Sequence, residues 1–566
     1  MSSVSADHLS IINYCLNKIA RHYSLTGACL YGSKVAGYSK PGSDFDIIIV
    51  LDKYPRIVKY VYMKQSKIRI SALVVDRRSL ERDAASAFLG EFVIGRLLHI
   101  YEPLFNQKLF VLLETLYKKR VIMEELIRII HSIKVLGTEV VFPLEFIMFS
   151  KIKRRSIMYP NALYSYYKTY TGPYAAKNIR AAIAGYRRAL SEILLDQKEL
   201  LIQRPSDSML QINEKCMLLG KRDDTYARDL KTVRHFQGLS SYLVHVYAGR
   251  KTFQHVVKEV ESKISRHRRS AINLPKFMSC PSEAFLKLPE GIIIIDDKNW
   301  LDKVSMHIGF PQYEVLYKIQ LGSLHGRSFC YTLRKDSRSG LRRSIVVKEL
   351  SKVKPVKWPL YDILGSYKKR SRLDPIFRLG CEYRALRYIR TLGLNSPPII
   401  SVVIGKKLLI TEYIHGKTIL DIVKDYSTTE ADYSTNSSLY WLRRSGEHIA
   451  KIHSKKSTFG NLNPADLIVS DQDLFFTGLE HFSFGSGDPL WDIVHFICSS
   501  LMPVRHNIHI TTKLTTKFLE GYSENININE AKANRNDLKH YIESFEPVIP
   551  PPTANVITKQ ISTYLM

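Results

Sequence analysis

Residues 30–52, which read LYGSKVAGYSKPGSDFDIIIVLD, constrain the fold more than any other part of the chain. We expect an apolar strand to end at Gly32 and Ser33 and a short helix to begin there. Such a turn offers backbone N–H groups, a hydroxyl and the positive end of a helix dipole to a phosphate. Asp44 and Asp46 follow at positions i and i+2 of a second expected strand, so both carboxylates face the same side of the sheet. The apolar run 47–51 is typical of a buried strand that holds them rigidly.

Two converging carboxylates beside a phosphate-binding turn suit the transfer of a phosphoryl or nucleotidyl group that depends on Mg²⁺ or Mn²⁺. The metal bridges the carboxylates and a triphosphate, neutralises charge and orients the leaving pyrophosphate. The alternative interpretation is a Gly-Ser turn followed by an acidic strand start, and each of these features is common by itself. Their joint occurrence at this spacing, with strands on both sides, favours the metal site.

The order Gly-Ser, spacer, Asp-x-Asp resembles the motif of the nucleotidyltransferase superfamily, which includes DNA polymerase beta and the minimal nucleotidyltransferases. The resemblance covers about the first hundred residues, which we delimit as 1–104. It implies an α/β nucleotidyltransferase fold in which Gly32 and Ser33 contact the triphosphate. It also implies that Asp44 and Asp46 are the catalytic, metal-binding carboxylates.

The chain departs from this family at the third carboxylate, which a neighbouring strand usually supplies as general base or metal ligand. The expected strand is KIRISALVVD (67–76), and its matching position is Ser71, which cannot serve as a carboxylate. Asp76 is the nearby acid, but a turn residue at the strand end is the better interpretation of it. Without a base, the attacking hydroxyl must be activated by the metal or by the substrate.

A second set of motifs lies in residues 291–566. SIVVKEL (344–350) places Lys348 in an apolar strand, and the helix expected over 378–389 carries Glu382. A Lys–Glu pair from a strand and a helix positions ATP phosphates in kinases. The stretches at 453–469 and 478–497 resemble the aminoglycoside phosphotransferases and small atypical archaeal and eukaryotic kinases. The resemblance implies a bilobal kinase-like fold with Lys348 and Glu382 at the nucleotide.

The acids of this second set are altered. Asn461 occupies the family's catalytic aspartate position, and asparagine cannot accept the proton of a substrate hydroxyl. Phe459 replaces the motif histidine, while Asp466 and Glu480 stand at the two metal-binding positions. In GDPLWD, the resemblance assigns structural roles to Asp488 and Asp492, with Asp492 holding the catalytic loop. Two interpretations stay open: a nucleotide-binding pseudokinase, which we favour, and a kinase with a rearranged acid set.

The net charge of +30 predicts a polyanionic partner, and RNA is the first candidate. Half of this charge lies in residues 105–290, which hold 32 Lys and Arg against 17 Asp and Glu. Tyrosines and cations interleave at 151–174, an arrangement that suits base stacking and phosphate neutralisation. Tyrosines packing a helical bundle with a solvated basic face are an equally good interpretation. The residues predicted to contact RNA are Lys151, Lys153, Arg154, Arg155, Tyr164, Tyr166, Tyr167 and Lys168.

Composition sets the remaining limits. A hydrophobic content of 45% with 24% charged residues excludes wholesale disorder. The seven cysteines stand alone, without CxxC, which favours a reducing cytoplasm, and no apolar run is long enough for a membrane helix.

The sequence therefore predicts an α/β multidomain protein: a nucleotidyltransferase domain (1–104), a helical basic domain (105–290) and a kinase-like domain (291–566). The predicted activity moves a nucleoside monophosphate from an NTP to a hydroxyl of RNA, such as tRNA, or of a protein, while the kinase-like domain binds ATP. One alternative is an atypical phosphotransferase active in the C-terminal half. Another is a non-enzymatic RNA-binding scaffold.

Overall fold

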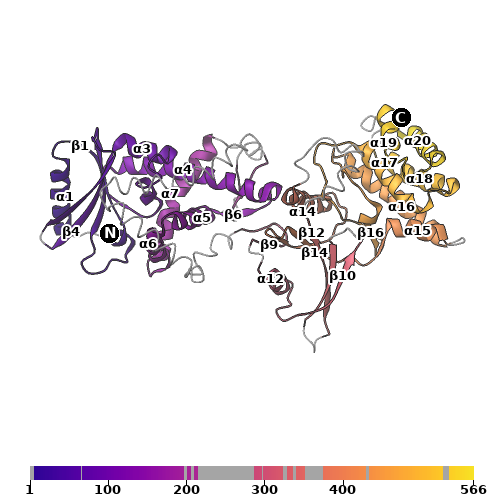
Figure 1. Cartoon of the computed structure of the whole chain (residues 1–566), viewed down its shortest axis with the longest axis horizontal. Coiled ribbons are helices and arrows are strands. Elements are labelled where there is room, and N and C mark those ends of the chain that lie inside the picture. Colours follow the sequence, from indigo (N-terminus) through magenta and orange to yellow (C-terminus); the bar gives the residue numbers. More distant parts are fainter. Residues whose placement is uncertain are drawn as a thin grey trace. The chain divides into compact units, whose positions relative to one another are not determined.

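The computed structural model describes residues 6–65, 67–196, 201–204, 209–214, 286–295, 298–322, 328–335, 340–350, 374–428, 433–526 and 535–565. They form a mixed α/β protein with several sheets and two compact units (Figure 1). The first unit comprises Met1–Ser132 and Val140–Lys287, and the second comprises Ile133–Glu139 and Leu288–Met566. Residues 215–285, much of the predicted helical domain, lie outside the described residues.

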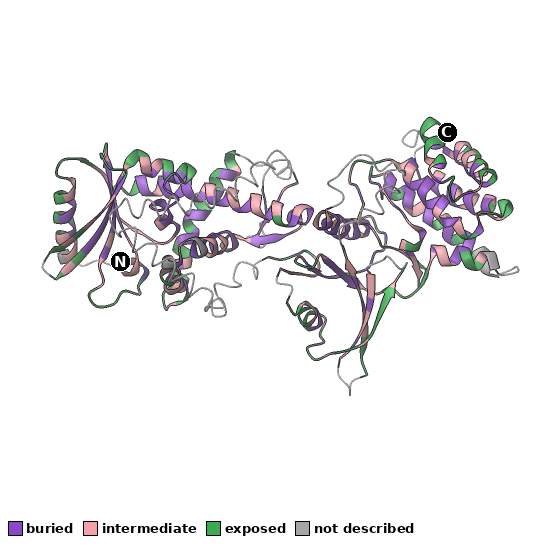
Figure 2. Ribbon diagram, in the orientation of Figure 1, coloured by how far each residue is buried: buried purple, intermediate pink, exposed green. Residues whose placement is uncertain are grey.

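The first unit contains a five-stranded sheet in the order β3-β4-β2-β1-β5. The strands are β1 (Ser24–Tyr31), β2 (Phe45–Asp52), β3 (Val58–Gln65), β4 (Ile68–Asp76) and β5 (Glu102–Phe105). β2 and β4 pair in parallel, and the other pairs are antiparallel. β2 and β4 are apolar along most of their length because both of their faces are covered (Figure 2). Helix α1 (Ala6–Ala20) packs on one face through Ile12 and Leu16, and α3 (Arg77–Ser86) contacts β2 and β4.

Helices make up most of the described part of residues 105–214. They are α4 (Gln107–Ile133), α5 (Leu144–Met158), α6 (Pro160–Thr171) and α7 (Ala175–Asp196), joined by a small sheet of β6 (Val141–Pro143), β8 (Met209–Ile212) and β7 (Leu201–Arg204). The short helix η2 (Lys134–Thr138) follows α4 but belongs to the second unit, where it packs against α14 (Pro375–Thr391).

A buried ionic cluster joins these helices to the segment after α3. Glu91, which is 1% exposed, accepts hydrogen bonds from Lys151 and Arg155, each at 2.7 Å, and pairs with Arg120 at 3.0 Å. Burial alone raises the pKa of Glu91, but the charges of Lys151, Arg120 and Arg155 outweigh burial and place the pKa below its ordinary value. The carboxylate is therefore ionised and shared among three cations from α4 and α5.

The second unit combines a sheet with a set of helices. The six-stranded sheet has the order β10-β11-β12-β14-β13-β9. Its strands are β9 (Ile292–Ile294), β10 (Glu314–Leu321), β11 (Ser328–Arg334), β12 (Arg342–Glu349), β13 (Ile399–Val403) and β14 (Leu408–Glu412). Helix α14 follows β12 along the chain and contacts β14, and the short helix α12 (Trp300–His307) contacts β13.

The helical part of the second unit follows β14. Its helices are α15 (Ile419–Thr428), α16 (Tyr433–His453), α17 (Pro489–Ser500), α18 (Ile508–Ser523), α19 (Arg535–Glu543) and α20 (Pro551–Leu565). A small sheet of β15 (Lys417–Thr418), β16 (Leu467–Ser470) and β17 (Asp473–Phe476) precedes α17. Within the described ranges, no helix combines the length and apolar character needed to cross a bilayer.

Replacing Glu91 by Gln tests the ionic cluster. The change leaves Lys151 and Arg155 buried without a full counter-charge, so we expect the free energy of unfolding to fall by about 3–5 kcal/mol. Urea unfolding of the full chain, followed by circular dichroism, measures the shift. Glu81→Gln, which breaks an exposed pair with Arg77, is the control and is expected to leave the midpoint nearly unchanged. Equal midpoints for the two variants would contradict a structural role of Glu91.

Comparison of the wild type with Glu91→Gln also gives a prediction of how stability depends on pH. Because the folded-state pKa of Glu91 is depressed, its stabilisation is fully present above the pKa of an unfolded Glu, about 4.3, and is lost as pH falls toward the folded-state value. The difference in stability between the wild type and Glu91→Gln is therefore expected to shrink below about pH 4. Unfolding midpoints measured from neutral pH to pH 3 check this sign, and a difference that widens on acidification would contradict it.

Candidate functional site

In the first unit, Asp46 lies directly against the Gly-Ser turn. Gly32 has φ +82°, and a Cβ placed there would lie 2.5 Å from Oδ2 of Asp46. Only glycine tolerates both this backbone conformation and this approach. Ser33 begins the four-residue helix α2 (Ser33–Ala36), and Tyr31, at the end of β1, pairs with Asp46 of β2. The sheet register thus places one carboxylate beside the turn predicted to bind phosphate.

Asp44 precedes β2 by one residue and is engaged by an arginine. Nε of Arg69, on β4, lies 2.8 Å from Oδ1 of Asp44, and both side chains are partly exposed. Arg69 also donates to the carbonyl of Gly42 in the loop before Asp44. Sequence reasoning missed Arg69, because only the parallel pairing of β2 with β4 brings it to this loop.

The position next to Asp46 on β4 is Ser71, which is buried. Asp76 caps helix α3 by accepting a hydrogen bond at 3.0 Å from the backbone N–H of Ser79. Asp76 therefore acts as the turn residue that the sequence favoured. The strand next to Asp46 therefore presents a hydroxyl, and not a carboxylate, beside it.

Helices α6 and α7 contact the turn from the other side. The side-chain amide of Asn178 donates to the carbonyls of Ala36 at 3.0 Å and Thr169 at 2.9 Å. The hydroxyls of Tyr38 and Ser165 lie 2.6 Å apart. Burial raises the pKa of Tyr38, and the charge of Asp46 acts in the same direction, so Tyr38 lies within electrostatic reach of Asp46. The Asn178–Ala36 and Tyr38–Ser165 contacts leave no local sequence signal because the residues of each pair are more than a hundred positions apart.

The prediction of RNA contact is wrong for several residues, because their side chains are buried. Lys151, Arg155 and Tyr166 are at most 5% exposed, and Lys151 and Arg155 are held by Glu91. Arg154 pairs with the buried Glu125. These side chains pack between the helices, as the alternative interpretation held. A buried carboxylate needs a cation beside it, so lysines and arginines of this basic stretch lie inside the protein and not on its surface.

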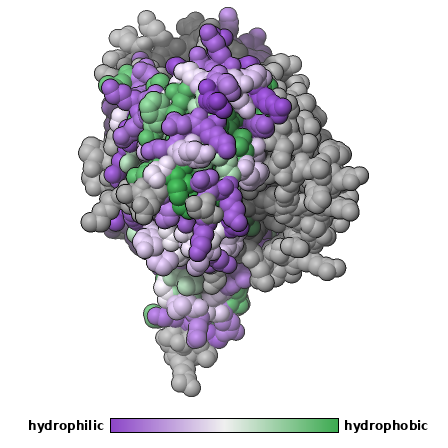
Figure 3. Space-filling model, turned by 90° about the vertical axis from the view of Figure 1, so that its left-hand side faces the viewer, coloured by the Kyte–Doolittle hydropathy of each residue, from purple (hydrophilic) through white to green (hydrophobic). Residues whose placement is uncertain are grey.

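The remaining predicted residues form a smaller group on α6. Tyr164 is 56% exposed, Tyr167 and Lys168 are half-buried, and Nζ of Lys168 lies 5.9 Å and 6.0 Å from the two ring centroids. Lys153, on α5, is half-buried. Figure 3 shows a mostly hydrophilic face with smaller apolar patches.

In the second unit, the predicted Lys–Glu pair is formed. Nζ of Lys348, on β12, lies 2.9 Å from the carboxylate of Glu382, on α14. Burial lowers the pKa of Lys348, but the charges of Glu382, Glu480 and Asp466 outweigh burial and raise the pKa overall. The lysine is therefore charged and faces three acidic side chains from three parts of the chain.

Asp466 and Glu480 differ in their surroundings. Burial raises the pKa of Asp466 to about 7, although Lys348 acts in the opposite direction. Glu480 accepts a hydrogen bond at 2.9 Å from Nη1 of Arg378, which lies one turn before Glu382 on α14. Among the residues that the structure describes, no three His, Cys, Asp or Glu side chains are grouped so as to hold a metal ion.

Asp492 holds the loop that follows α16. Its carboxylate accepts hydrogen bonds from the backbone N–H groups of Phe459 at 2.6 Å and Gly460 at 2.7 Å, and His453 lies 3.2 Å away. Phe459 is buried and stacks on Phe476. The half-buried Asn461 follows directly in this loop.

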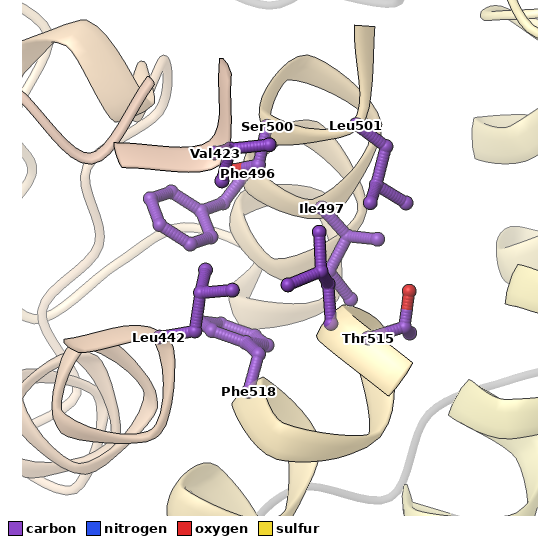
Figure 4. A pocket seen from close by; sticks show the side chains of 9 residues that line it. Val423, Leu442, Phe496, Ile497, Ser500, Leu501, Thr515 and Phe518 are labelled. Atoms are coloured by element: carbon purple, nitrogen blue, oxygen red, sulfur yellow. The ribbon is translucent and has the colours of Figure 1, made fainter. Parts of the chain in front are cut away.

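Asp488 occupies the N-cap of α17, where it accepts a hydrogen bond from the backbone N–H of Leu490 at 2.9 Å. A small apolar pocket lies elsewhere in the helical part and is lined by Val423, Leu442, Phe496 and neighbours (Figure 4). None of the predicted site residues lines that pocket.

The chain is similar to known proteins over only part of its length. No family model matches the chain. A probable bifunctional tRNA threonylcarbamoyladenosine biosynthesis protein of Methanococcus vannielii is 28% identical over 144 residues, which are 25% of this chain and 24% of that protein. The chain thus spans about a quarter of the length of this curated relative.

Solved kinase-like structures are also similar to part of the chain. WaaP, solved in complex with acyl carrier protein, is 11% identical, with a TM-score of 0.26 over 46% of this chain and 98% of its own. The PknI kinase domain of Mycobacterium tuberculosis is 11% identical, with a TM-score of 0.21 over 36% of this chain and 74% of its own.

Replacing Asp492 by Asn tests the loop anchor. The amide would turn an N–H₂ group toward backbone donors, so we expect the second unit to lose about 2–3 kcal/mol of stability. Asp374→Asn is the matched control, because Asp374 caps α14 through Oδ1 and Asn also caps helices well, so stability should change by less than about 0.5 kcal/mol. Thermal unfolding of the full chain, followed by calorimetry, measures both, and equal effects would contradict the anchoring role.

Proposed function

We propose that the first unit transfers a nucleoside monophosphate from a nucleoside triphosphate to a hydroxyl group of an acceptor. The observation that carries this proposal is the approach of the Asp46 carboxylate to Gly32, which joins a carboxylate to a Gly-Ser turn at one point of the sheet. Asp44 lies two residues before Asp46, and its strand neighbour Arg69 adds a cation at the same edge. This combination favours a triphosphate and its counter-ion over a neutral ligand.

The reaction assigns a role to each of these groups. The acceptor oxygen attacks the α-phosphorus, the bond from that phosphorus to the bridging oxygen of the β-phosphate breaks, and pyrophosphate leaves with the electron pair. The backbone N–H groups and hydroxyl at Gly32 and Ser33 donate to the phosphates. Asp44 and Asp46 would hold Mg²⁺ or Mn²⁺, which supplies positive charge to the leaving pyrophosphate. Since Ser71 cannot act as a base, the proton of the acceptor hydroxyl would pass to a phosphate oxygen of the substrate or to water, and a metal held by Asp44 and Asp46 would make that hydroxyl more acidic.

RNA, such as tRNA, is the acceptor that we favour. The support is the net charge of +30 and the group on α6 formed by the exposed Tyr164 with the half-buried Tyr167 and Lys168, since α6 also contacts Tyr38 beside the turn. The relative named for tRNA threonylcarbamoyladenosine biosynthesis points in the same direction. A hydroxyl of a protein is the competing acceptor.

A second candidate function is nucleotide binding by the second unit. The Lys348–Glu382 pair favours it, because this pair would present an ammonium to nucleotide phosphates. Asn461 cannot accept a proton, so we favour a binding domain over a kinase with a rearranged acid set.

Labelled nucleotides decide between these functions. The full chain is incubated with small RNA, protein extract, Mg²⁺ and NTPs labelled at the α- or γ-phosphate. Transfer of the α-label supports the first proposal, whereas transfer of the γ-label that is lost in Lys348→Met indicates phosphotransfer by the second unit. Transfer of neither label, with RNA still bound, indicates a non-enzymatic RNA-binding scaffold.

Asp46→Asn is expected to lower α-label transfer by about 100-fold or more, because it removes a carboxylate that would hold the metal. Asp44→Asn should act in the same direction. Asp52→Asn is the control, since Asp52 ends the same strand six residues beyond Asp46. Wild-type rates in Asp46→Asn would overturn the proposal.

Gly32→Ala tests the close approach itself. The added methyl group would meet Oδ2 of Asp46 and strain a positive φ, so transfer is expected to fall by about tenfold or more. Gly42→Ala carries the same backbone strain at φ +77° but meets no atom closer than 3.8 Å. Equal rates of α-label transfer in Gly32→Ala and Gly42→Ala would contradict a role of the Gly32–Asp46 contact in transfer.

A further inference from the structure

Arg378 holds a carboxylate that the kinase-like resemblance assigns to a metal. Its Nη1 donates to Oε2 of Glu480 at 2.9 Å, and the Arg378 side chain is only 7% exposed. Nε2 of His481 lies 3.6 Å from the other oxygen, Oε1. Both oxygens of Glu480 therefore face nitrogen groups of the protein.

The position of Arg378 is set by the helix that carries it. Asp374 caps α14 by accepting hydrogen bonds from the backbone N–H groups of Ile376 and Phe377, and Pro375 opens the first turn. Arg378 and Glu382 are four residues apart, so they lie on the same face of α14. One helix face thus presents Glu382 to Lys348 and Arg378 to Glu480.

This arrangement does not fit a divalent cation bound by Glu480. A metal ion on Oε2 would have to replace Arg378 and leave a buried guanidinium without its counter-charge, which is costly in a protein interior, whereas a metal ion on Oε1 would have to share that oxygen with Nε2 of His481. Asp466 would then be the remaining carboxylate at the two predicted metal positions. The guanidinium already supplies the positive charge that screens Glu480 from phosphates.

We propose that the second unit binds nucleotides without a divalent cation, with Arg378 neutralising Glu480 and Lys348 contacting the phosphates. The inference rests on the second candidate function, nucleotide binding at Lys348. It assigns Arg378 as a specificity-determining residue that makes the site indifferent to Mg²⁺. The nucleotidyl transfer proposed for the first unit keeps its own dependence on metal.

Photolabelling separates the two units. The full chain is titrated with 8-azido-ATP in Mg²⁺ or in EDTA, irradiated and digested, and labelled peptides from residues 288–566 are quantified by mass spectrometry. We expect half-saturation of these peptides to differ by less than about threefold between the two conditions. A requirement for Mg²⁺, with half-saturation in EDTA at least about tenfold higher, overturns the inference but leaves the nucleotide site in place.

Variants identify the residue responsible. Arg378→Met leaves the charge of Glu480 facing the phosphates, so labelling in EDTA is expected to weaken by about tenfold while Mg²⁺ restores it. Arg390→Met removes another ion pair of the same helix, with Glu290, and should behave like the wild type. Should Arg378→Met not fold, the wild-type comparison decides alone. If these peptides are labelled neither in Mg²⁺ nor in EDTA, the nucleotide site itself is overturned, and with it this inference.

Discussion

The ionised carboxylate of Glu91 is the interaction on which the first unit depends. It lies in the segment after α3 and binds cations from α4 and α5, so the sheet and the helices that follow it form one body. Such a buried cluster is stable only when every charged member is paired, because an unpaired charge in the interior raises the free energy of the folded state by several kcal/mol. The same packing brings α6 and α7 against α2, where Asn178 bonds the carbonyl of Ala36. The turn at Gly32 is therefore supported by helices that begin more than a hundred residues later.

The two units use charge in different ways. In the first, Asp44 lies at a partly exposed edge, where it pairs with Arg69. In the second, two ion pairs connect a strand, a helix and a loop: Lys348 with Glu382, and Arg378 with Glu480. An exposed edge can exchange an arginine for a metal and a triphosphate at small cost, whereas a buried pair cannot. This difference in solvent exposure is the physical basis for proposing metal-dependent chemistry in one unit and metal-independent binding in the other.

Some contacts of the candidate sites could be predicted because their motifs are local. Gly32 and Asp46 lie at the end of one strand and the start of the next, and the register of β1 with β2 places Tyr31, next to Gly32, opposite Asp46. The position of Ser71 beside Asp46 followed from the expected strand at 67–76. The exposure of the residues predicted to contact RNA was harder to predict, because exposure of a lysine depends on what packs over it. Lys151 and Lys168 lie in similar basic, tyrosine-rich sequence, yet Lys151 points at Glu91 and Lys168 lies near the rings of Tyr164 and Tyr167.

The sequence by itself determined the local elements of this protein: an apolar strand followed directly by Gly32, the strand that carries Asp46 with Asp44 just before it, and a lysine and a glutamate at strand and helix positions. Tertiary structure alone decided which charges meet. Arg69 reaches Asp44 through the parallel pairing of β2 with β4, Arg378 reaches Glu480 from a helix about a hundred residues earlier, and Glu91 collects cations from two helices. Ion pairs between distant segments leave no spacing pattern in a single chain, because their geometry arises only when the segments pack.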